Sequence, residues 1–264
     1  MWSVASPIGE DEGINALDRL CRPDRYPRSA AYDAAWLLQL DMGPHPLWQL
    51  EDLLADIALP ADAHVLDLGA GKGATSVYLA REYGVTVTSL DLWVPAKERE
   101  HVCAAEGVAE RVTAIEGDVR TVDLGNDVFD AIVSVDAFEY FGTDVHLLPT
   151  LLPALKSGGW LAMSTPALRE DPYAVGIPPH VERVLGWEAA AWHTPDWWAR
   201  HWELSGMLTD VRARWQNGGR DSWLLWEQAR RELTNEAGPS AVLEMLRADT
   251  DEQIGFALVS ARKR

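Results

Sequence analysis

The residues of this chain best suited to chemistry gather in one glycine-rich turn. The turn follows the short apolar run 64–68 and precedes the segment 74–83, which has helical spacing and ends at Gly84. Glycine permits a sharp turn and a close approach to a ligand because it has no Cβ. The turn residues with this potential are Gly69, Gly71, Lys72 and Gly73. The pattern therefore predicts a strand, a ligand-binding turn and a helix.

The glycine spacing alone fits two kinds of nucleotide ligand. Gly69, Gly71 and Ala74 satisfy the G-x-G-x-x-G/A pattern of a dinucleotide-binding turn. Asp91 follows about twenty residues later, where such a turn is followed by an acid that binds ribose. An NAD-binding oxidoreductase therefore stays open at this point, beside an enzyme that uses S-adenosylmethionine.

Three further features favour S-adenosylmethionine over NAD. Asp67 stands just before the first glycine, where its carboxylate would reach a cationic amino group. Asp118 closes the third expected strand, where it would reach the exocyclic amine of adenine. The last third of the chain reads as strand, helices and strand, which fits a closing antiparallel strand better than a second mononucleotide-binding half. We therefore expect S-adenosylmethionine as the cofactor.

Four motifs occur in an order that is known from one enzyme family. They are VLDLGAGKG, VTSLD, EGDV and FDAIVSVDAFEYFG. In these motifs the sequence resembles the class I S-adenosylmethionine-dependent methyltransferases of the small-molecule type, and the surrounding segments resemble a bacterial group labelled cyclopropane-synthase-like. The resemblance covers about residues 45–165, and the remainder by topology only. It implies a Rossmann-like α/β fold with a seven-stranded sheet and helices on both faces.

The resemblance also implies a role for individual positions. The loop on the methionine side would comprise Asp67, Gly69, Gly71, Lys72 and Gly73. Asp91 would hold both ribose hydroxyls, since a carboxylate accepts two hydrogen bonds side by side. The adenine would contact Leu92, Trp93, Asp118 and Val119. Asp136, at the end of the fourth strand, would lie near the sulfonium that carries the methyl group.

The methyl acceptor is expected beyond the carboxyl ends of the fourth and fifth strands, where ligands of parallel sheets bind. Our candidate catalytic residues there are Glu139, Tyr140 and His193. Many methyltransferases that this chain resembles have a histidine at or near the position of Glu139. The glutamate would serve as a base for an amine or hydroxyl if burial raised its pKa. It would equally suit the solvated start of a helix, and a lone histidine is more often structural.

Tryptophan is concentrated in one part of the chain. Eight of the thirteen tryptophans lie between Trp187 and Trp226, after the fifth expected strand. Aromatic residues at helical spacing most often pack in a core. The alternative is an aromatic pocket for a hydrophobic or cationic acceptor.

The elements that must position these residues alternate between strand and helix from residue 61 onward. Such alternation predicts a parallel sheet covered by helices on both faces. We expect residues 1–60 to form an N-terminal helical cap, and residues 61–264 to form the methyltransferase domain. A substrate-side insertion is expected at about 166–205, irregular over 166–193 because it holds four prolines.

Composition limits the partners and the setting. A formal net charge of −18 disfavours binding to nucleic acid and to anionic membrane surfaces. The N-terminus lacks the features of a secretory signal, and no apolar run reaches the length of a membrane span. Two cysteines and scattered histidines predict neither a disulfide scaffold nor a metal site. We expect a cytoplasmic protein with a small-molecule acceptor, and whether it forms a homodimer is left open.

The sequence thus predicts transfer of a methyl group to an O, N or C nucleophile of a small, hydrophobic or aromatic metabolite. Most of the rate enhancement would come from holding donor and acceptor in line. Besides the NAD-binding oxidoreductase, one further alternative is a methyltransferase-like protein that binds the cofactor without turnover.

Overall fold

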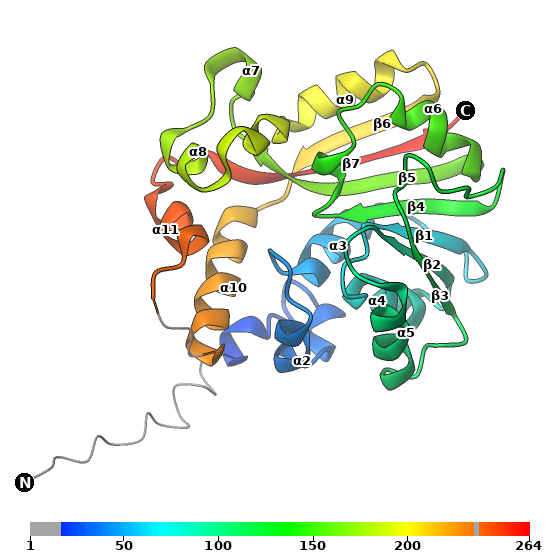
Figure 1. Ribbon diagram of the computed structural model, residues 1–264, viewed down its shortest axis with the longest axis horizontal. Coiled ribbons are helices and arrows are strands. Elements are labelled where there is room, and N and C mark those ends of the chain that lie inside the picture. The colour runs from blue at the N-terminus through cyan, green and yellow to red at the C-terminus, as the bar shows by residue number, and fades with distance from the viewer. Residues whose placement is uncertain (1–16, 235–237) are drawn as a thin grey trace, which may run out of the picture.

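A twisted seven-stranded sheet forms the centre of the computed structural model, which describes residues 17–234 and 238–264 (Figure 1). The strand order is β3-β2-β1-β4-β5-β7-β6. The strands are β1 (His64–Leu68), β2 (Thr86–Asp91), β3 (Val112–Glu116), β4 (Phe129–Val135), β5 (Leu155–Leu168), β6 (Leu208–Trp215) and β7 (Ile254–Lys263).

The direction of the strands confirms the expected Rossmann-like fold. Strands β1 to β5 pair in parallel, and β7 inserts antiparallel between β5 and β6. Strand β5 is longer than the expected segment 159–165, because its residues from Trp160 to Leu168 all pair with β7. The switch in strand order falls between β1 and β4, and ligands of such sheets bind beside that switch.

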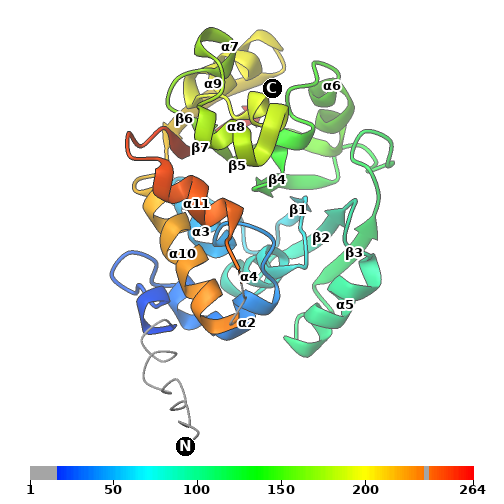
Figure 2. The ribbon, with the colours of Figure 1, turned by 60° about the vertical axis from the view of Figure 1, so that its left-hand side comes forward.

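Helices cover both faces of the sheet (Figures 1 and 2). The α-helices are α2 (Ala34–Gln39), α3 (Pro46–Leu54), α4 (Ala74–Tyr83), α5 (Ala96–Ala105), α6 (Leu147–Leu151), α7 (Pro172–Val175), α8 (Pro179–Leu185), α9 (Pro195–Leu204), α10 (Gly219–Thr234) and α11 (Ala241–Ala248). In the described part of the chain, the short 3-10 helices are η1 (Ser29–Ala31), η2 (Phe138–Tyr140), η3 (Leu152–Ala154) and η4 (Gly186–Ala191).

Alternating strand residues divide the core into two layers. Val65 packs with residues of α3, α4 and α10 on one face. Leu66 and Leu68 pack with residues of α6 and α9 on the other. This alternation is what a strand buried on both faces requires.

The N-terminal segment shares its core with the sheet. Leu50 of α3 and Trp226 of α10 belong to the same buried cluster as Val65 of β1. Tyr26 stacks on Trp48 at a centroid distance of 5.4 Å. Elements from opposite ends of the chain therefore pack on one face of the sheet, beside β1.

The segment after β5 is more regular than its prolines suggested. The expectation of an irregular stretch over 166–193 is wrong, because residues up to Leu168 belong to β5 and α7, α8 and η4 follow. Prolines occupy the first turns of α7, α8 and α9, where the missing N–H costs nothing. Helix α9 is capped by Thr194, whose side chain accepts a hydrogen bond from the Trp197 N–H.

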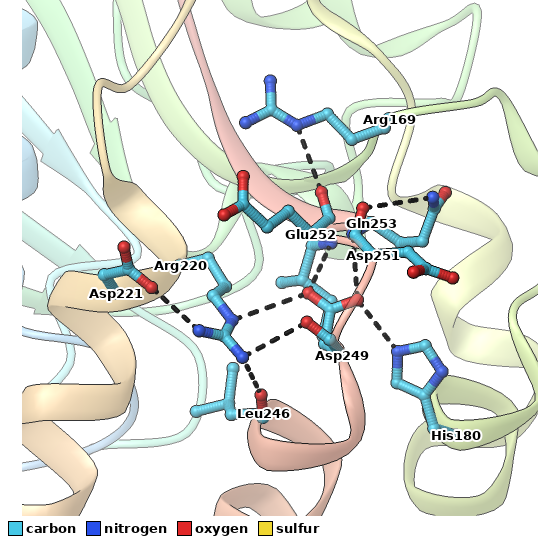
Figure 3. A network of polar contacts seen from close by, with 10 residues as sticks. Arg169, His180, Arg220, Asp221, Leu246, Asp249, Asp251, Glu252 and Gln253 are labelled. Carbon is cyan, nitrogen blue, oxygen red and sulfur yellow. Dashed lines mark hydrogen bonds and ion pairs between the residues drawn. The ribbon is translucent and has the colours of Figure 1, made fainter.

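A buried carboxylate joins this inserted segment to the C-terminal helices (Figure 3). The Asp249 side chain is fully buried and accepts hydrogen bonds from the backbone N–H groups of Gln253 and Ile254, at 2.9 and 3.0 Å. It also pairs with the His180 ring of α8 at 3.1 Å and with the Arg220 guanidinium of α10 at 3.7 Å. One carboxylate thus links α8, α10 and the start of β7.

Within residues 17–234 and 238–264, no helix is both long and apolar enough to cross a bilayer. In the same ranges no three His, Cys, Asp or Glu side chains gather closely enough to hold a metal ion.

Candidate cofactor and acceptor site

The glycine-rich turn is wedged between two other segments of the chain. Gly69 has φ +73°, and a Cβ built there would lie 2.3 Å from the Cβ of Ala137. Gly71 has φ +52°, and its Cβ would lie 2.9 Å from the Sδ of Met42. The Gly69 and Ala70 N–H groups donate to the Leu90 carbonyl at the end of β2. Glycine is therefore required both for the backbone conformation and for the close packing.

A cavity of about 340 Å³ opens above this turn, within the range of 300–1,000 Å³ typical of small-ligand sites. Most of the residues expected at the site line it. These are Gly69, Gly71, Lys72, Asp91, Leu92, Trp93, Asp118, Val119, Asp136 and Tyr140. The loops after β1, β2, β3 and β4 thus converge on one cavity, as the sequence predicted.

Asp91 and Asp118 lie at the β2 and β3 end of the cavity. The Asp91 carboxylate accepts the N–H groups of Trp93 and Val94 at 2.7 and 2.8 Å, and the Gly71 N–H at 2.8 Å. Three accepted bonds leave one of about four acceptor sites for a ligand hydroxyl. Asp118 pairs with the Arg120 guanidinium through bonds of 2.5 to 3.0 Å, which lowers the pKa of the carboxyl.

Asp67 and Gly73 are two expected site residues that do not line the cavity. The Asp67 carboxylate is buried and accepts hydrogen bonds from the hydroxyls of Thr75 and Ser76, at 2.7 and 2.5 Å. Burial raises its pKa to about 6. Both hydroxyls bond to Oδ2 and join the turn to the start of α4, and the contact of Asp67 with a ligand amino group stays a prediction. Gly73, at φ +95°, is the N-cap of α4.

Two carboxylates lie at the β4 end of the cavity. Asp136 lines it with φ +54°, and its Oδ2 lies so near Gly43 that a Cβ there would be 2.6 Å away. Burial, together with Glu139 and Asp41, raises the pKa of Asp136 well above its usual value. Glu139 is buried behind the lining and accepts a 2.7 Å hydrogen bond from the Thr165 hydroxyl of β5. Burial raises the pKa of Glu139 to about 7, so it is not the solvated helix-start acid of the alternative interpretation.

Two aromatic side chains meet across the mouth of the cavity. The rings of Trp93, after β2, and Tyr140, after β4, make an edge contact at 4.8 Å. Both are more than half exposed and both line the cavity. Desolvation of its hydroxyl, together with the nearby carboxylates Glu139 and Asp136, raises the pKa of Tyr140, so little phenolate is present near neutral pH to act as a base.

His193 does not reach the cavity lining. Its ring is fully buried, bonds to the Asp171 carboxylate at 2.9 Å and stacks on Trp197 at 3.6 Å. Burial lowers its pKa. The expected catalytic role of His193 is therefore corrected to packing within the segment between β5 and β6.

The tryptophans of α9 pack in the hydrophobic core. Trp198 and Trp202 of α9 are fully buried against Phe138, each at a centroid distance of 5.8 Å. They thereby support η2, the element that carries Glu139 and Tyr140. The packing interpretation of these tryptophans is confirmed.

Sequence reasoning missed the segment 40–44, which covers the cavity from the N-terminal side. Its lining residues are Leu40, Met42, Gly43 and Pro44. The Trp226 Nε1–H of α10 donates to the Asp41 carboxylate and to the Gly43 carbonyl, both at 2.9 Å. The Lys72 ammonium donates to the carbonyls of Gln39 and Asp41, at 3.2 and 3.3 Å. The segment is a loop between α2 and α3, and no local pattern in the sequence predicts that it lies over the cavity.

Comparison with known proteins identifies the part of the chain that holds the site. Residues 65–159 match a family model described as a methyltransferase domain. The chain is 31% identical, over 127 residues, to a sarcosine/dimethylglycine N-methyltransferase of Halorhodospira halochloris, which covers 48% of this chain and 46% of that protein. It is 28% identical, over 155 residues, to a probable tocopherol O-methyltransferase of Oryza sativa subsp. japonica, which covers 56% and 43%. The chain spans about half or less of the length of these relatives.

A solved structure extends the likeness to the fold of almost the whole chain. Phosphoethanolamine N-methyltransferase 2 of Haemonchus contortus, solved in complex with S-adenosyl-L-methionine, superposes with a TM-score of 0.69 at 18% identity. The superposition covers 94% of this chain and 60% of that one. The resemblance to class I methyltransferases that the sequence motifs indicated is thus confirmed for the fold and for the domain over 65–159.

Proposed function

We propose that this protein is an S-adenosylmethionine-dependent methyltransferase that acts on a small molecule. The observation that carries the proposal is the glycine turn itself, packed against Ala137 with no room for a Cβ, at the centre of a cavity that Asp91 and Asp118 line. The methyltransferase domain match over residues 65–159 supports it. An oxidoreductase function finds no such support.

The chain offers a suitable group for each part of this cofactor. Asp91 has acceptor capacity left for ribose, and Asp118 and Val119 lie where an adenine edge would be read. The glycine turn would hold the methionine part. When bound, the cofactor supplies an electrophilic methyl group on a sulfonium. The residues of segment 40–44 and the loop after β4 would exclude water and orient the acceptor.

Parallel calorimetric titrations test the proposal. S-adenosylmethionine and S-adenosylhomocysteine are expected to bind with micromolar Kd, and NAD is expected to give no heat. The Asp91→Asn variant should bind S-adenosylhomocysteine at least tenfold more weakly. Asp62→Asn is the matched control, because Asp62 is exposed and precedes β1, at the opposite end of that strand from the cavity.

Two outcomes would contradict the proposal. Binding of NAD alone would favour the oxidoreductase. An unchanged affinity in Asp91→Asn would show that the cavity does not hold the cofactor in this orientation. Formation of S-adenosylhomocysteine with an acceptor then separates an enzyme from a protein that only binds the cofactor.

A further inference from the structure

The two ends of the cavity differ in what they offer a ligand. Asp91 and Asp118 follow β2 and β3, on one side of the glycine turn. Asp136 follows β4, on the other side of β1. If the proposed function holds, the nucleoside occupies the first end, and the acceptor must approach at the β4 end.

Within residues 17–234 and 238–264, the Asp136 carboxylate has no hydrogen-bonding or ion-pairing partner. Among the residues that the structure describes, none donates a hydrogen bond to that side chain, although its backbone N–H donates to the Ser164 carbonyl at 2.8 Å. It is only partly exposed, and Gly43 packs directly against Oδ2. A carboxylate withdrawn from water without a donor is costly, so a bound cation or hydrogen-bond donor would relieve that cost.

The surroundings of Asp136 favour a cation over any other ligand group. Glu139 is a further acidic side chain close to it, and Asp41, which pairs with the Arg230 guanidinium at 3.6 Å, also lies nearby. Two basic side chains appear in the described lining, and both are engaged elsewhere: Arg120 pairs with Asp118, and the Lys72 ammonium bonds to two backbone carbonyls. An acceptor that carries a carboxylate or phosphate would therefore be repelled by these acidic side chains. Neither Lys72 nor Arg120 is placed to bind it.

The two segments that meet at Asp136, 40–44 and the loop after β4, also bring apolar side chains to the cavity. These are Leu40, Met42, Pro44, Tyr140 and Phe141. Such side chains suit a hydrocarbon or aromatic body beside a single polar group.

From this placement we infer that the methyl acceptor is a small amine with an apolar body, whose protonated nitrogen binds the Asp136 carboxylate. For transfer, the bound nitrogen would give one proton to that carboxylate, and its lone pair would then form the new N–C bond as the C–S bond of the cofactor breaks and leaves neutral S-adenosylhomocysteine. The inference rests on the proposed function and narrows its substrate class. Asp136 selects the amine by charge, and the bound cation in turn keeps the partly buried carboxylate ionised.

Three probes of nearly equal shape test the inference: 2-phenylethylamine, 2-phenylethanol and phenylacetate. Each is titrated by calorimetry into protein saturated with S-adenosylhomocysteine, which carries no sulfonium and permits no turnover. The amine is expected to bind at least tenfold more tightly than the alcohol, and phenylacetate most weakly. In Asp136→Asn the ratio of amine to alcohol affinity should fall close to one. Asparagine also adopts positive φ readily, so this variant keeps the backbone conformation.

The outcomes separate the two proposals. Failure of the wild-type protein to bind S-adenosylhomocysteine would contradict the proposed function before any probe is added. Normal binding of S-adenosylhomocysteine with equal affinities for amine and alcohol, with tighter binding of phenylacetate, or with no heat from any probe at millimolar concentration, would overturn the amine inference alone. A tenfold loss of S-adenosylhomocysteine affinity in Asp136→Asn, with the amine preference unchanged, would assign Asp136 to the cofactor. Asp62→Asn should retain the wild-type ratio.

Discussion

Three glycines allow the close packing of the cofactor turn to be measured separately from backbone strain. Gly84, Gly71 and Gly69 all have positive φ, at +67°, +52° and +73°. An alanine in this region costs about 1–2 kcal/mol through its Cβ. A Cβ on Gly84 meets nothing within 4 Å, one on Gly71 meets the flexible end of Met42, and one on Gly69 meets the fixed Cβ of Ala137 at 2.3 Å.

The expected order of destabilisation follows from these neighbours. Gly84→Ala should cost about 1–2 kcal/mol in the free energy of unfolding, from strain alone. Gly69→Ala should cost a further 1–3 kcal/mol or so, because relief of the overlap must shift the loop after β4 or the turn itself. Gly71→Ala should lie between them, since the Met42 thioether is able to move away.

Urea denaturation and calorimetry with S-adenosylhomocysteine measure both consequences. Gly84→Ala should retain the wild-type Kd, while Gly69→Ala should bind at least tenfold more weakly because its turn is displaced. Gly71→Ala keeps the comparison informative if Gly69→Ala does not fold. Equal losses of stability in Gly84→Ala and Gly69→Ala, together with an unchanged Kd in the latter, would refute the claim that the turn and the β4 loop are in fixed contact.

Three further predictions concern buried polar groups. Trp226→Phe removes the two hydrogen bonds of the indole to segment 40–44 and leaves the ion pair of Arg230 with Asp41, so it should cost about 1–3 kcal/mol in urea denaturation and speed the release of S-adenosylhomocysteine several-fold in stopped-flow fluorescence; an unchanged release rate would contradict a role of these two hydrogen bonds in holding the segment over the cavity. Asp249→Ala leaves Arg220 without its buried carboxylate and should cost about 3–5 kcal/mol, whereas a loss below 1 kcal/mol or so would show that the network is not stabilising. Glu139 has its pKa raised to about 7, so the folded protein binds more protons than the unfolded chain between about pH 4.5 and 7, and wild-type stability due to this group falls as the pH rises through that window. Glu139→Gln, which still accepts from Thr165 but does not titrate, should therefore gain stability relative to wild type over that window, by at most about 3 kcal/mol at pH 8, and a constant difference across pH would contradict the raised pKa.

Much of the fold follows from local signals in the sequence. Helix α4 occupies the residues expected of it, because its start at the glycine turn and its stop at Gly84 are both set locally. Strand β5 was predicted too short, since its extension to Leu168 depends on pairing with β7, about ninety residues later. The short helices after β5 were missed because prolines break helices in the interior but are accommodated in the first turn.

Some positions of the site could likewise be predicted from the sequence, and others could not. Asp91, Asp118 and Asp136 were correctly expected at the cavity, because the carboxyl ends of parallel strands meet at one edge of the sheet. Asp67 lies at a strand end as well, but two hydroxyls in the first turn of α4 engage its carboxylate away from the cavity. The position of His193 depends on the path of the segment between β5 and β6, and no periodicity in the sequence predicts that path.

The cover formed by segment 40–44 has a thermodynamic consequence for the whole chain. Asp41 and Gly43 precede β1 in the sequence and their partner Trp226 follows β6, so covering the cavity requires these two distant segments to meet. Any ligand that binds more tightly because segment 40–44 covers it must stabilise the contact of that segment with Trp226 by the same free energy, because linkage is reciprocal. Ligand binding should therefore slow hydrogen exchange in α2 and in α10 together, although α10 itself does not line the cavity.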